Sequence, residues 1–182
     1  MNAQSPNLSQ PMLETWTAAD GTVITIRPIS AADLPLETEF VNGLSASTGY
    51  QRLMSSRRPS PEELRRFTNI DHQRKLALIA STLVQDKERQ IGVARYVKES
   101  TSGDAEFAIV LSDAWQGRGV GTKLLASLLV AAKTHGVRRL VGMTLSENSG
   151  MLALGRKLGF TLARDPRSAT ITNLTVDLAA SS

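Results

Sequence analysis

The fold of this chain is decided by a glycine-rich stretch that runs from Leu111 to Leu124 and reads LSDAWQGRGVGTKL. An apolar run of strand length, residues 105–111, leads into it, and a predicted long helix that ends at His135 and Gly136 follows it. Glycines let the main chain approach a ligand closely, and a helix start aims N–H groups and its positive end at an anion. The stretch therefore predicts a phosphate-binding loop.

Two common phosphate loops do not fit the spacing of these glycines. A P-loop needs a glycine followed directly by Lys and Ser or Thr, whereas one residue separates the last glycine from Lys123. The dinucleotide-binding fingerprint needs its third glycine three residues after the second, whereas Gly117, Gly119 and Gly121 are spaced by two. The pattern that does fit is Gln/Arg-x-x-Gly-x-Gly/Ala, over residues 116–121.

Strands and helices are predicted along the rest of the chain. The expected strands are residues 22–27, 76–84, 91–97, 105–111, 138–145, 160–164 and 170–178. The expected helices are residues 30–43, 45–53, 60–68, 121–135 and 150–158. Strands that first form hairpins and later alternate with helices predict an α/β fold, a mixed sheet with helices on both faces.

Length and composition indicate one folded domain. The chain has 182 residues, and 41% of them are hydrophobic, which is enough for a substantial core. Residues 1–20 are rich in Asn, Gln, Ser and Pro, so they are expected to form a flexible leader. The domain is then expected to cover residues 21–182.

Several classes of protein are disfavoured by what the sequence lacks. It has no cysteine, which excludes disulfide scaffolds, thiolate zinc sites and cysteine nucleophiles, and no metal site is expected. No apolar run approaches the roughly 20 residues of a membrane-spanning helix, and the first basic residue is Arg27, unlike a secretory signal. The sequence predicts a cytoplasmic protein without a membrane partner.

The positive charge is unevenly distributed. The formal net charge is +4, and residues 49–75 carry seven basic against three acidic side chains, while residues 113–182 carry nine against four. Only 4% of the residues are aromatic, which leaves few rings to stack on bases. A solvated basic face or a phosphorylated small ligand is therefore favoured over a nucleic acid.

At residues 116–121 the chain resembles the GNAT superfamily of N-acetyltransferases. The flanks extend the resemblance over residues 22–178, because Leu145 to Asn148 and Lys157 to Phe160 are similar to the second motif of that family. The resemblance implies a GNAT fold, with a twisted, mostly antiparallel sheet of six to seven strands, and acetyl-CoA as cosubstrate. The expected cofactor contacts are Ile109, Val110 and Leu111 by their main chain, the loop residues Gln116, Gly117, Arg118, Gly119, Val120, Gly121 and Thr122, and Asn148.

Some of these contacts have structural alternatives. Arg118 and Lys123 are candidates for the phosphates, but both could equally be solvated charges at a helix start. Asn148 could cap the helix that follows it, a role compatible with a cofactor contact.

A closer likeness concerns the acceptor. The stretches that carry it are Pro28-Ile29, Gly43 to Ser45, Ser60 to Leu64, Ala105 to Val110 and Asp113 to Gly119. They resemble the acetyltransferase domain of bacterial protein lysine acetyltransferases, which implies a protein acceptor such as an acyl-CoA synthetase. A small amine, for example a polyamine or an antibiotic, is the alternative acceptor, and a non-catalytic acetyl-CoA-binding regulator is the third hypothesis.

Glu106 is the expected general base. A lysine amine with a pKa near 10.4 is almost fully protonated at neutral pH, so its proton must be removed before it attacks. Glu106 lies in an otherwise apolar strand and is expected to be desolvated there, although strand alternation could instead turn it to solvent. The resemblance to the lysine acetyltransferases implies the same role. The Tyr that many GNAT enzymes use as general acid is replaced by Gly155, so no general acid is assigned.

Overall fold

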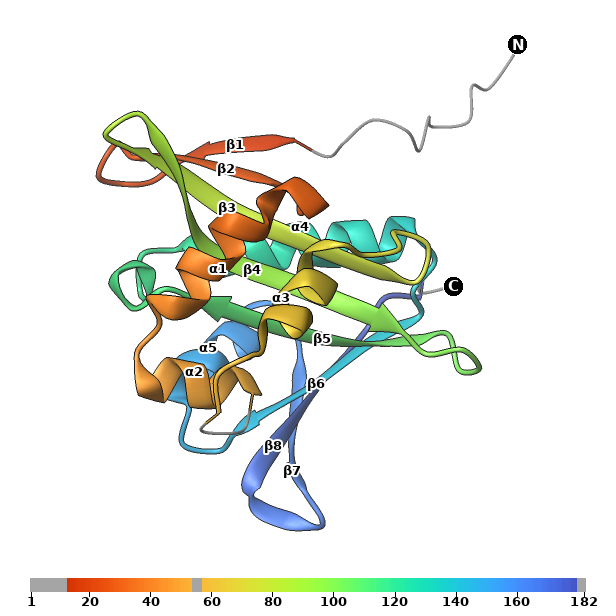
Figure 1. Ribbon diagram of the computed structural model, residues 1–182. Helices are drawn as coiled ribbons and strands as arrows, with labels where there is room; N and C mark the ends of the chain where they lie inside the picture. Colours follow the sequence, from red (N-terminus) through yellow and green to blue (C-terminus); the bar gives the residue numbers. More distant parts are fainter. Residues whose placement is uncertain (1–12, 54–56, 180–182) are drawn as a thin grey trace.

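The computed structural model describes residues 13–53 and 57–179, which form a single eight-stranded sheet with helices on both faces (Figure 1). The strands are β1 (Glu14–Thr17), β2 (Val23–Pro28), β3 (Lys75–Val84), β4 (Lys87–Lys98), β5 (Asp104–Leu111), β6 (Arg139–Leu145), β7 (Thr161–Asp165) and β8 (Ser168–Asp177). Their order in the sheet is β1-β2-β3-β4-β5-β6-β8-β7, and only β5 and β6 pair in parallel. The predicted mixed, mostly antiparallel α/β sheet is confirmed, with eight strands instead of six or seven.

The additional strand, β1, corrects the prediction of a leader over residues 1–20. β1 pairs with β2 in antiparallel register, Trp16 packs against the core, and Ala18 is only 6% exposed. The strand was missed because the first 20 residues are mostly polar. Only Trp16 and Ala18 supply apolar surface to the core there. Residues 1–12 of the predicted leader lie outside the described residues.

The helices are α1 (Leu34–Asn42), α2 (Ala46–Leu53), α3 (Pro61–Thr68), α4 (Val120–Thr134) and α5 (Ser149–Lys157), with 3-10 turns at Ala31–Asp33 and Asp113–Trp115. α3 begins with the capping box that its sequence predicts: Glu63 N–H donates to the Ser60 hydroxyl, and Ser60 N–H donates to the Glu63 carboxylate. Within residues 13–53 and 57–179, no helix is long and apolar enough to cross a membrane.

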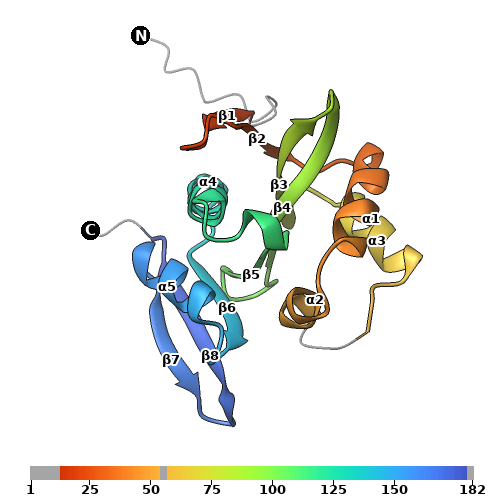
Figure 2. The ribbon, with the colours of Figure 1, turned by 90° about the vertical axis from the view of Figure 1, so that its left-hand side faces the viewer.

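Two hydrophobic clusters hold the helices on the sheet. α4 and α5 lie on one face, and α1, α2 and α3 lie on the other (Figure 2). Leu124, Leu125 and Leu128 of α4 are fully buried in the first cluster. Phe40 of α1 and Ile79 of β3 belong to the second. The middle strands are therefore covered on both faces, which explains why β3 and β4 read as nearly continuous apolar runs.

The β3–β4 hairpin is tighter than expected. The sequence predicts strands over residues 76–84 and 91–97 with six residues between them, whereas the turn is made by Gln85 and Asp86, both with positive φ, and β4 begins at Lys87. The register of the two strands shifts so that Ile91 is an extra residue in β4, a β-bulge. The bulge places Gln90 and Arg95, an odd number of residues apart, on the same face of the sheet.

Candidate functional site

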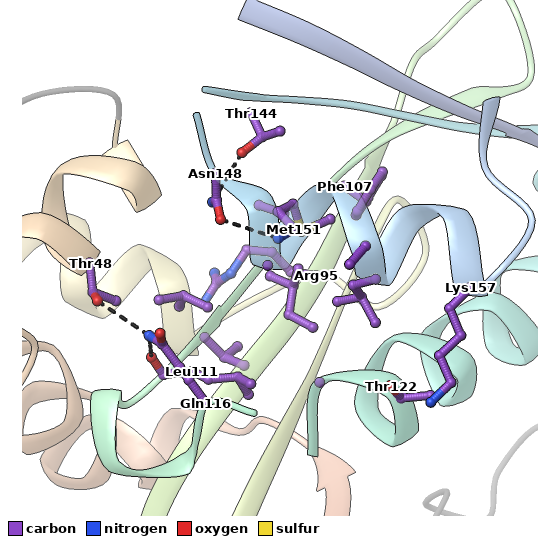
Figure 3. A pocket seen from close by; sticks show the side chains of 18 of the residues that line it. Thr48, Arg95, Phe107, Leu111, Gln116, Thr122, Thr144, Asn148, Met151 and Lys157 are labelled. Atoms are coloured by element: carbon purple, nitrogen blue, oxygen red, sulfur yellow. Dashed lines mark hydrogen bonds between the residues drawn. The ribbon is translucent and has the colours of Figure 1, made fainter. Parts of the chain in front are cut away.

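A split in the sheet opens a cavity beside the glycine loop. The parallel strands β5 and β6 pair only from Asp104 to Glu106, and beyond that point they separate. The Phe107 ring fills the start of the split and lies against Gly142 of β6. A Cβ added to Gly142 would be only 2.6 Å from a carbon of that ring, so only glycine leaves room for it. The cavity between the strands measures about 730 Å³ and is lined by strands, by α5 and by the loop before α4 (Figure 3).

The glycine loop has the geometry that its spacing predicts. Gly117 and Gly119 both have positive φ, at +72° and +87°, a conformation that residues with a Cβ rarely adopt. Gly119 directly precedes the first residue of α4, Val120, so the unpaired N–H groups of the first helical turn face the end of the loop. Gly121 packs closely on Leu111: a Cβ added to Gly121 would be 3.1 Å from a side-chain carbon of Leu111. The loop is therefore shaped to hold an anion at the helix start.

The structure brings most of the predicted site residues together around this cavity. Ten of them line it: Glu106, Ile109, Val110, Leu111, Gln116, Gly117, Gly119, Gly121, Thr122 and Asn148. Arg118 and Val120 do not, and the side chain of Val120 is fully buried in the core. Val120 can therefore contact a ligand only through its main chain.

The two basic residues of the loop are held in ion pairs by the N-terminal hairpin. The Arg118 guanidinium pairs with Asp20 and lies 4.0 Å from the centre of the Trp115 ring. Lys123 pairs with Glu14 of β1, and the hydrogen bond from Lys123 lowers the pKa of Glu14. The sequence left two roles open for these side chains, phosphate contacts or solvated charges. The ion pairs show that neither side chain is a simple solvated charge. β1 and the turn after it partly neutralise the cations beside the loop.

Lys157 is a cation of the cavity that sequence reasoning missed. It is exposed, it lines the cavity, and in Figure 3 its amine end points toward Thr122, at the end of the glycine loop. A signal was available, because Lys157 directly precedes the Leu158-Gly159-Phe160 segment of the second motif.

A hydrogen-bond network joins the glycine loop to α2. Nε2 of Gln116 donates to the Thr48 hydroxyl and to the Leu111 carbonyl, both at 3.3 Å (Figure 3). Asp113 accepts from Ser45 N–H at 2.9 Å, from the Ser45 hydroxyl at 3.1 Å and from the Thr48 hydroxyl. The Ser45 hydroxyl caps the first turn of α2 by accepting from Thr48 N–H at 3.2 Å, and Asp113, 67 positions after the start of α2, holds that cap in place.

The open edge of β5 offers main-chain groups to the cavity, but not from all three predicted residues. Ser112 N–H donates to the Ile91 carbonyl. In an antiparallel pair every second residue directs its N–H and C=O to the neighbouring strand, so Val110, two residues before Ser112, directs its groups toward β4. The groups of Ile109 and Leu111 then point into the split, where Gln116 already occupies the Leu111 carbonyl. The N–H and C=O of Ile109 and the N–H of Leu111 are therefore left facing the cavity, and the main chain of Val110 is not available to a ligand.

Glu106 lies where β5 and β6 part, and its side chain is exposed. The expectation that it is desolvated was wrong. Alternation turns its apolar neighbours Ala105 and Phe107 into the core beneath α4 and α5, and Glu106 to the opposite face, where the helices leave it accessible. Its carboxylate still lines the cavity that the glycine loop closes at the other end.

Asn148 and Gly155 complete the α5 side of the site. Oδ1 of Asn148 accepts from Met151 N–H at 3.1 Å, and its Nδ2 donates to the Thr144 hydroxyl at 3.2 Å, so it caps α5 while lining the cavity. Gly155 is buried against Leu174: a Cβ added to Gly155 would be 2.7 Å from a side-chain carbon of Leu174. A larger residue does not fit there, which gives a packing reason for the missing Tyr.

Comparisons with known proteins agree with this architecture. The model of the acetyltransferase (GNAT) domain matches residues 24–161. An acetyltransferase of Pseudomonas aeruginosa is 31% identical over 152 residues, which cover 83% of this chain and 82% of the relative. The acetyltransferase Pat of Mycolicibacterium smegmatis is 27% identical over 83% of this chain but only 45% of its own length. The crystal structure of the GNAT domain of S. lividans PAT superposes with a TM-score of 0.81 at 26% identity, covering 91% of this chain and 96% of that domain.

Proposed function

Because the chain belongs to the GNAT family of acetyltransferases, we propose that it transfers the acetyl group of acetyl-CoA to a lysine side chain of a protein, with Glu106 as general base. The observation that carries the proposal is that Glu106 and the glycine loop line one cavity, at the two ends of the open edge of β5. A thioester held along that edge would lie between the anion site and the base.

The residues of the donor side fit acetyl-CoA. Its pyrophosphate suits the N–H groups at the start of α4, where Gly117, Gly119 and Gly121 line the cavity with main chain. Lys157 adds a cation at the same end of the cavity. The amide-rich pantetheine arm suits the C=O of Ile109 and the N–H of Leu111, which would bind it as a neighbouring strand does. When bound, acetyl-CoA supplies an activated acetyl group.

The acceptor side provides the proton acceptor. Glu106 takes the proton of the attacking ammonium group directly or through water, which leaves the neutral amine that can attack. Ile109 N–H points to the open edge, where it can stabilise negative charge on the thioester oxygen. The departing thiol has an ordinary pKa near that of cysteine, about 8.5, so its thiolate can leave without an acid at the position of Gly155.

A protein acceptor is supported by two features. The first is the similarity of the chain to the acetyltransferase Pat of Mycolicibacterium smegmatis and to the GNAT domain of S. lividans PAT, beside its resemblance in sequence to protein lysine acetyltransferases. The acceptor side of the cavity is also open, because Glu106 and Met143 are both exposed there. A small amine stays the second candidate, since a methionine sulfoximine acetyltransferase of Pseudomonas aeruginosa is 31% identical over 65 residues, 36% of this chain.

The experiment that tests the proposal measures CoA release from acetyl-CoA. The purified protein is offered a panel of small amines, including spermidine, and a panel of folded proteins that includes acyl-CoA synthetases, and the acetylated residue is located by mass spectrometry. Acetylation of one lysine in a folded protein supports the proposal. Turnover with small amines alone would assign the second candidate, and no turnover with any acceptor would contradict catalysis.

A further inference from the structure

Phe67 forms an inner wall of the cavity on the face where Glu106 lies. It comes from α3 and lines the cavity together with Val93 of β4 and Ala108 of β5. Arg95 pairs with Ala108 across β4 and β5, and Glu106 is the diagonal neighbour two residues away on the same face. Phe67 and Arg95 therefore form the part of the cavity wall that lies beside Glu106 and extends toward Val93.

Arg95 holds Phe67 in place through two contacts. Its guanidinium carbon lies 4.8 Å from the centre of the Phe67 ring, and its Nη1 donates to the Phe67 carbonyl at 3.3 Å. The first contact fixes the ring and the second fixes the end of α3 from which the ring projects. An aromatic ring held at both its face and its backbone has little freedom to swing aside.

Arg95 is itself fixed by a buried carboxylate. Oε1 of Glu37 lies 3.5 Å from Nη2 of Arg95, and Oε2 of Glu37 accepts from Nε2 of Gln90 at 2.5 Å. Glu37 is 0% exposed. The bulge at Ile91 is needed for this arrangement, because without it Gln90 and Arg95 would face opposite sides of the sheet. Glu37, Arg95 and Phe67 thus form a continuous stack from the core beneath α1 to the cavity wall.

The chemistry of the proposed reaction determines what meets this wall. The reacting carbon of the thioester has three substituents besides the incoming amine: oxygen, sulfur and the acyl chain. The sulfur leads back along β5 to the glycine loop, and the amine enters from solvent beside Glu106. The acyl chain is left with the inner direction, toward Val93, which is 2% exposed, and Phe67.

We propose that Phe67 is the specificity-determining residue for acyl length, restricting the donor to short acyl groups, and that Glu37 and Arg95 are the residues that position it. This inference rests on the proposed acetyl transfer. A wall that can move adapts to a longer chain, whereas a wall tied to a buried ion pair does not. Ala108, with its small side chain beside the ring, leaves room for the acetyl group.

The test measures the affinity of the full chain for CoA, acetyl-CoA, butyryl-CoA and hexanoyl-CoA by titration calorimetry. The wild type should bind CoA and acetyl-CoA with similar Kd and hexanoyl-CoA at least about 10-fold more weakly. Phe67→Ala should remove that penalty while leaving the Kd of CoA unchanged, and Phe67→Leu, the safer variant for folding, should remove part of it. Glu62→Ala, an exposed change on the same helix, is the control and should behave as wild type.

Positioning by the ion pair is tested with the same readout. Arg95→Gln should relax discrimination between hexanoyl-CoA and acetyl-CoA by several-fold, and Arg95→Lys should restore part of it, which a general loss of stability would not do. An unchanged ratio in both Phe67 variants would overturn the proposal, as would a change confined to the KM of the acceptor. Failure of the wild type to bind CoA at all would instead contradict the proposed function.

Discussion

Gln116 and Thr48 join the two sides of the cavity through a hydrogen bond of 3.3 Å between the amide Nε2 and the hydroxyl. Gln116 opens the glycine loop, and Thr48 belongs to the first turn of α2, so the loop and α2 share one hydrogen-bond network at the cavity. Asp113 anchors the network by accepting from both Ser45 and Thr48. The position of α2 therefore depends on a carboxylate that follows β5.

Asp113→Asn should lower stability in a pH-dependent way. The hydrogen bond from Thr48 lowers the pKa of Asp113 below its ordinary value of 3.8. A lowered pKa contributes stability above the ordinary value and loses it as the pH falls through the folded value. Weakening the hydrogen bonds that Ser45 and Thr48 donate to this carboxylate costs about 1 kcal/mol, or about 2–4 °C in Tm for a chain of this size. Thermal unfolding should show that deficit at pH 7 and a smaller one below about pH 4.

Asp86→Asn is the matched control, because it removes an exposed carboxylate from the β3–β4 turn, away from the cavity. It should change Tm little at either pH. A deficit for Asp113→Asn that stays constant from pH 7 to pH 3 would show that the charge of Asp113 does not support α2.

Gly119→Asp should abolish stabilisation by acetyl-CoA. At a hundredfold excess over Kd, a ligand that binds only the folded state adds about 2.7 kcal/mol, which raises Tm by about 5–10 °C. The Asp carboxylate would add a negative charge beside the expected pyrophosphate, and its Cβ would come within 3.3 Å of the Trp16 ring at a positive φ. Differential scanning fluorimetry with and without acetyl-CoA measures the effect.

Two variants separate charge from backbone strain. Gly119→Ala carries the strain without the charge and should retain part of the Tm shift. Gly136→Asp places the same residue at a positive φ (+74°) at the other end of α4 and should keep the full ligand-induced shift. An undiminished shift in Gly119→Asp would mean that the cofactor binds elsewhere.

Local patterns predicted most of the fold. The capping box of α3 and the glycine loop before α4 each depend on residues close together in the chain, and both were found as expected. β1 was missed because its strand partner and its core contacts, not its composition, make it a strand. The exposure of Glu106 likewise depends on which part of the sheet the helices cover, which no local pattern specifies.

The candidate site was predictable where its residues share one segment. The ion pair of Arg118 with Asp20 joins residues 98 positions apart, and the hydrogen bond from Gln116 to Thr48 spans 68 positions. Neither contact can be predicted from the spacing of residues that are close together in the chain. The stack of Glu37, Arg95 and Phe67 depends further on the register shift at Ile91, which no turn residue signals.

Glu106→Gln should leave acetyl-CoA binding intact and remove most turnover near neutral pH. The substitution keeps the size of the side chain but removes the proton acceptor, and loss of a general base typically costs about 10²- to 10⁴-fold in rate. Calorimetry should show an unchanged Kd for acetyl-CoA, and CoA release should show the lower kcat. Glu62→Gln, an exposed change on α3, is the control. Wild-type turnover by Glu106→Gln would mean that another group or solvent takes the proton.

Reversing two exposed charges on α3 should slow acetylation of a protein more than acetylation of a small amine. Arg65 and Arg66 are both exposed, in a basic segment that would repel a polycation and attract an acidic protein surface. Arg57 and Arg58 belong to the same segment, but Arg57 pairs with Glu63 of the α3 capping box, so reversing it would also disturb that helix. Arg65→Glu with Arg66→Glu is therefore the cleaner test.

The best protein acceptor of the panel and spermidine serve as the two substrates. In the wild type, kcat/KM for the protein should be far higher than for spermidine and should fall as salt screens the attraction. The double reversal should lower kcat/KM for the protein about 10-fold at low salt, flatten its salt dependence, and leave the protein acetylated at the same lysine. Lys87→Glu with Lys133→Glu changes the net charge equally at two other exposed positions and should have little effect. Comparable kcat/KM values for spermidine and the best protein in the wild type would overturn the protein acceptor and favour the small amine.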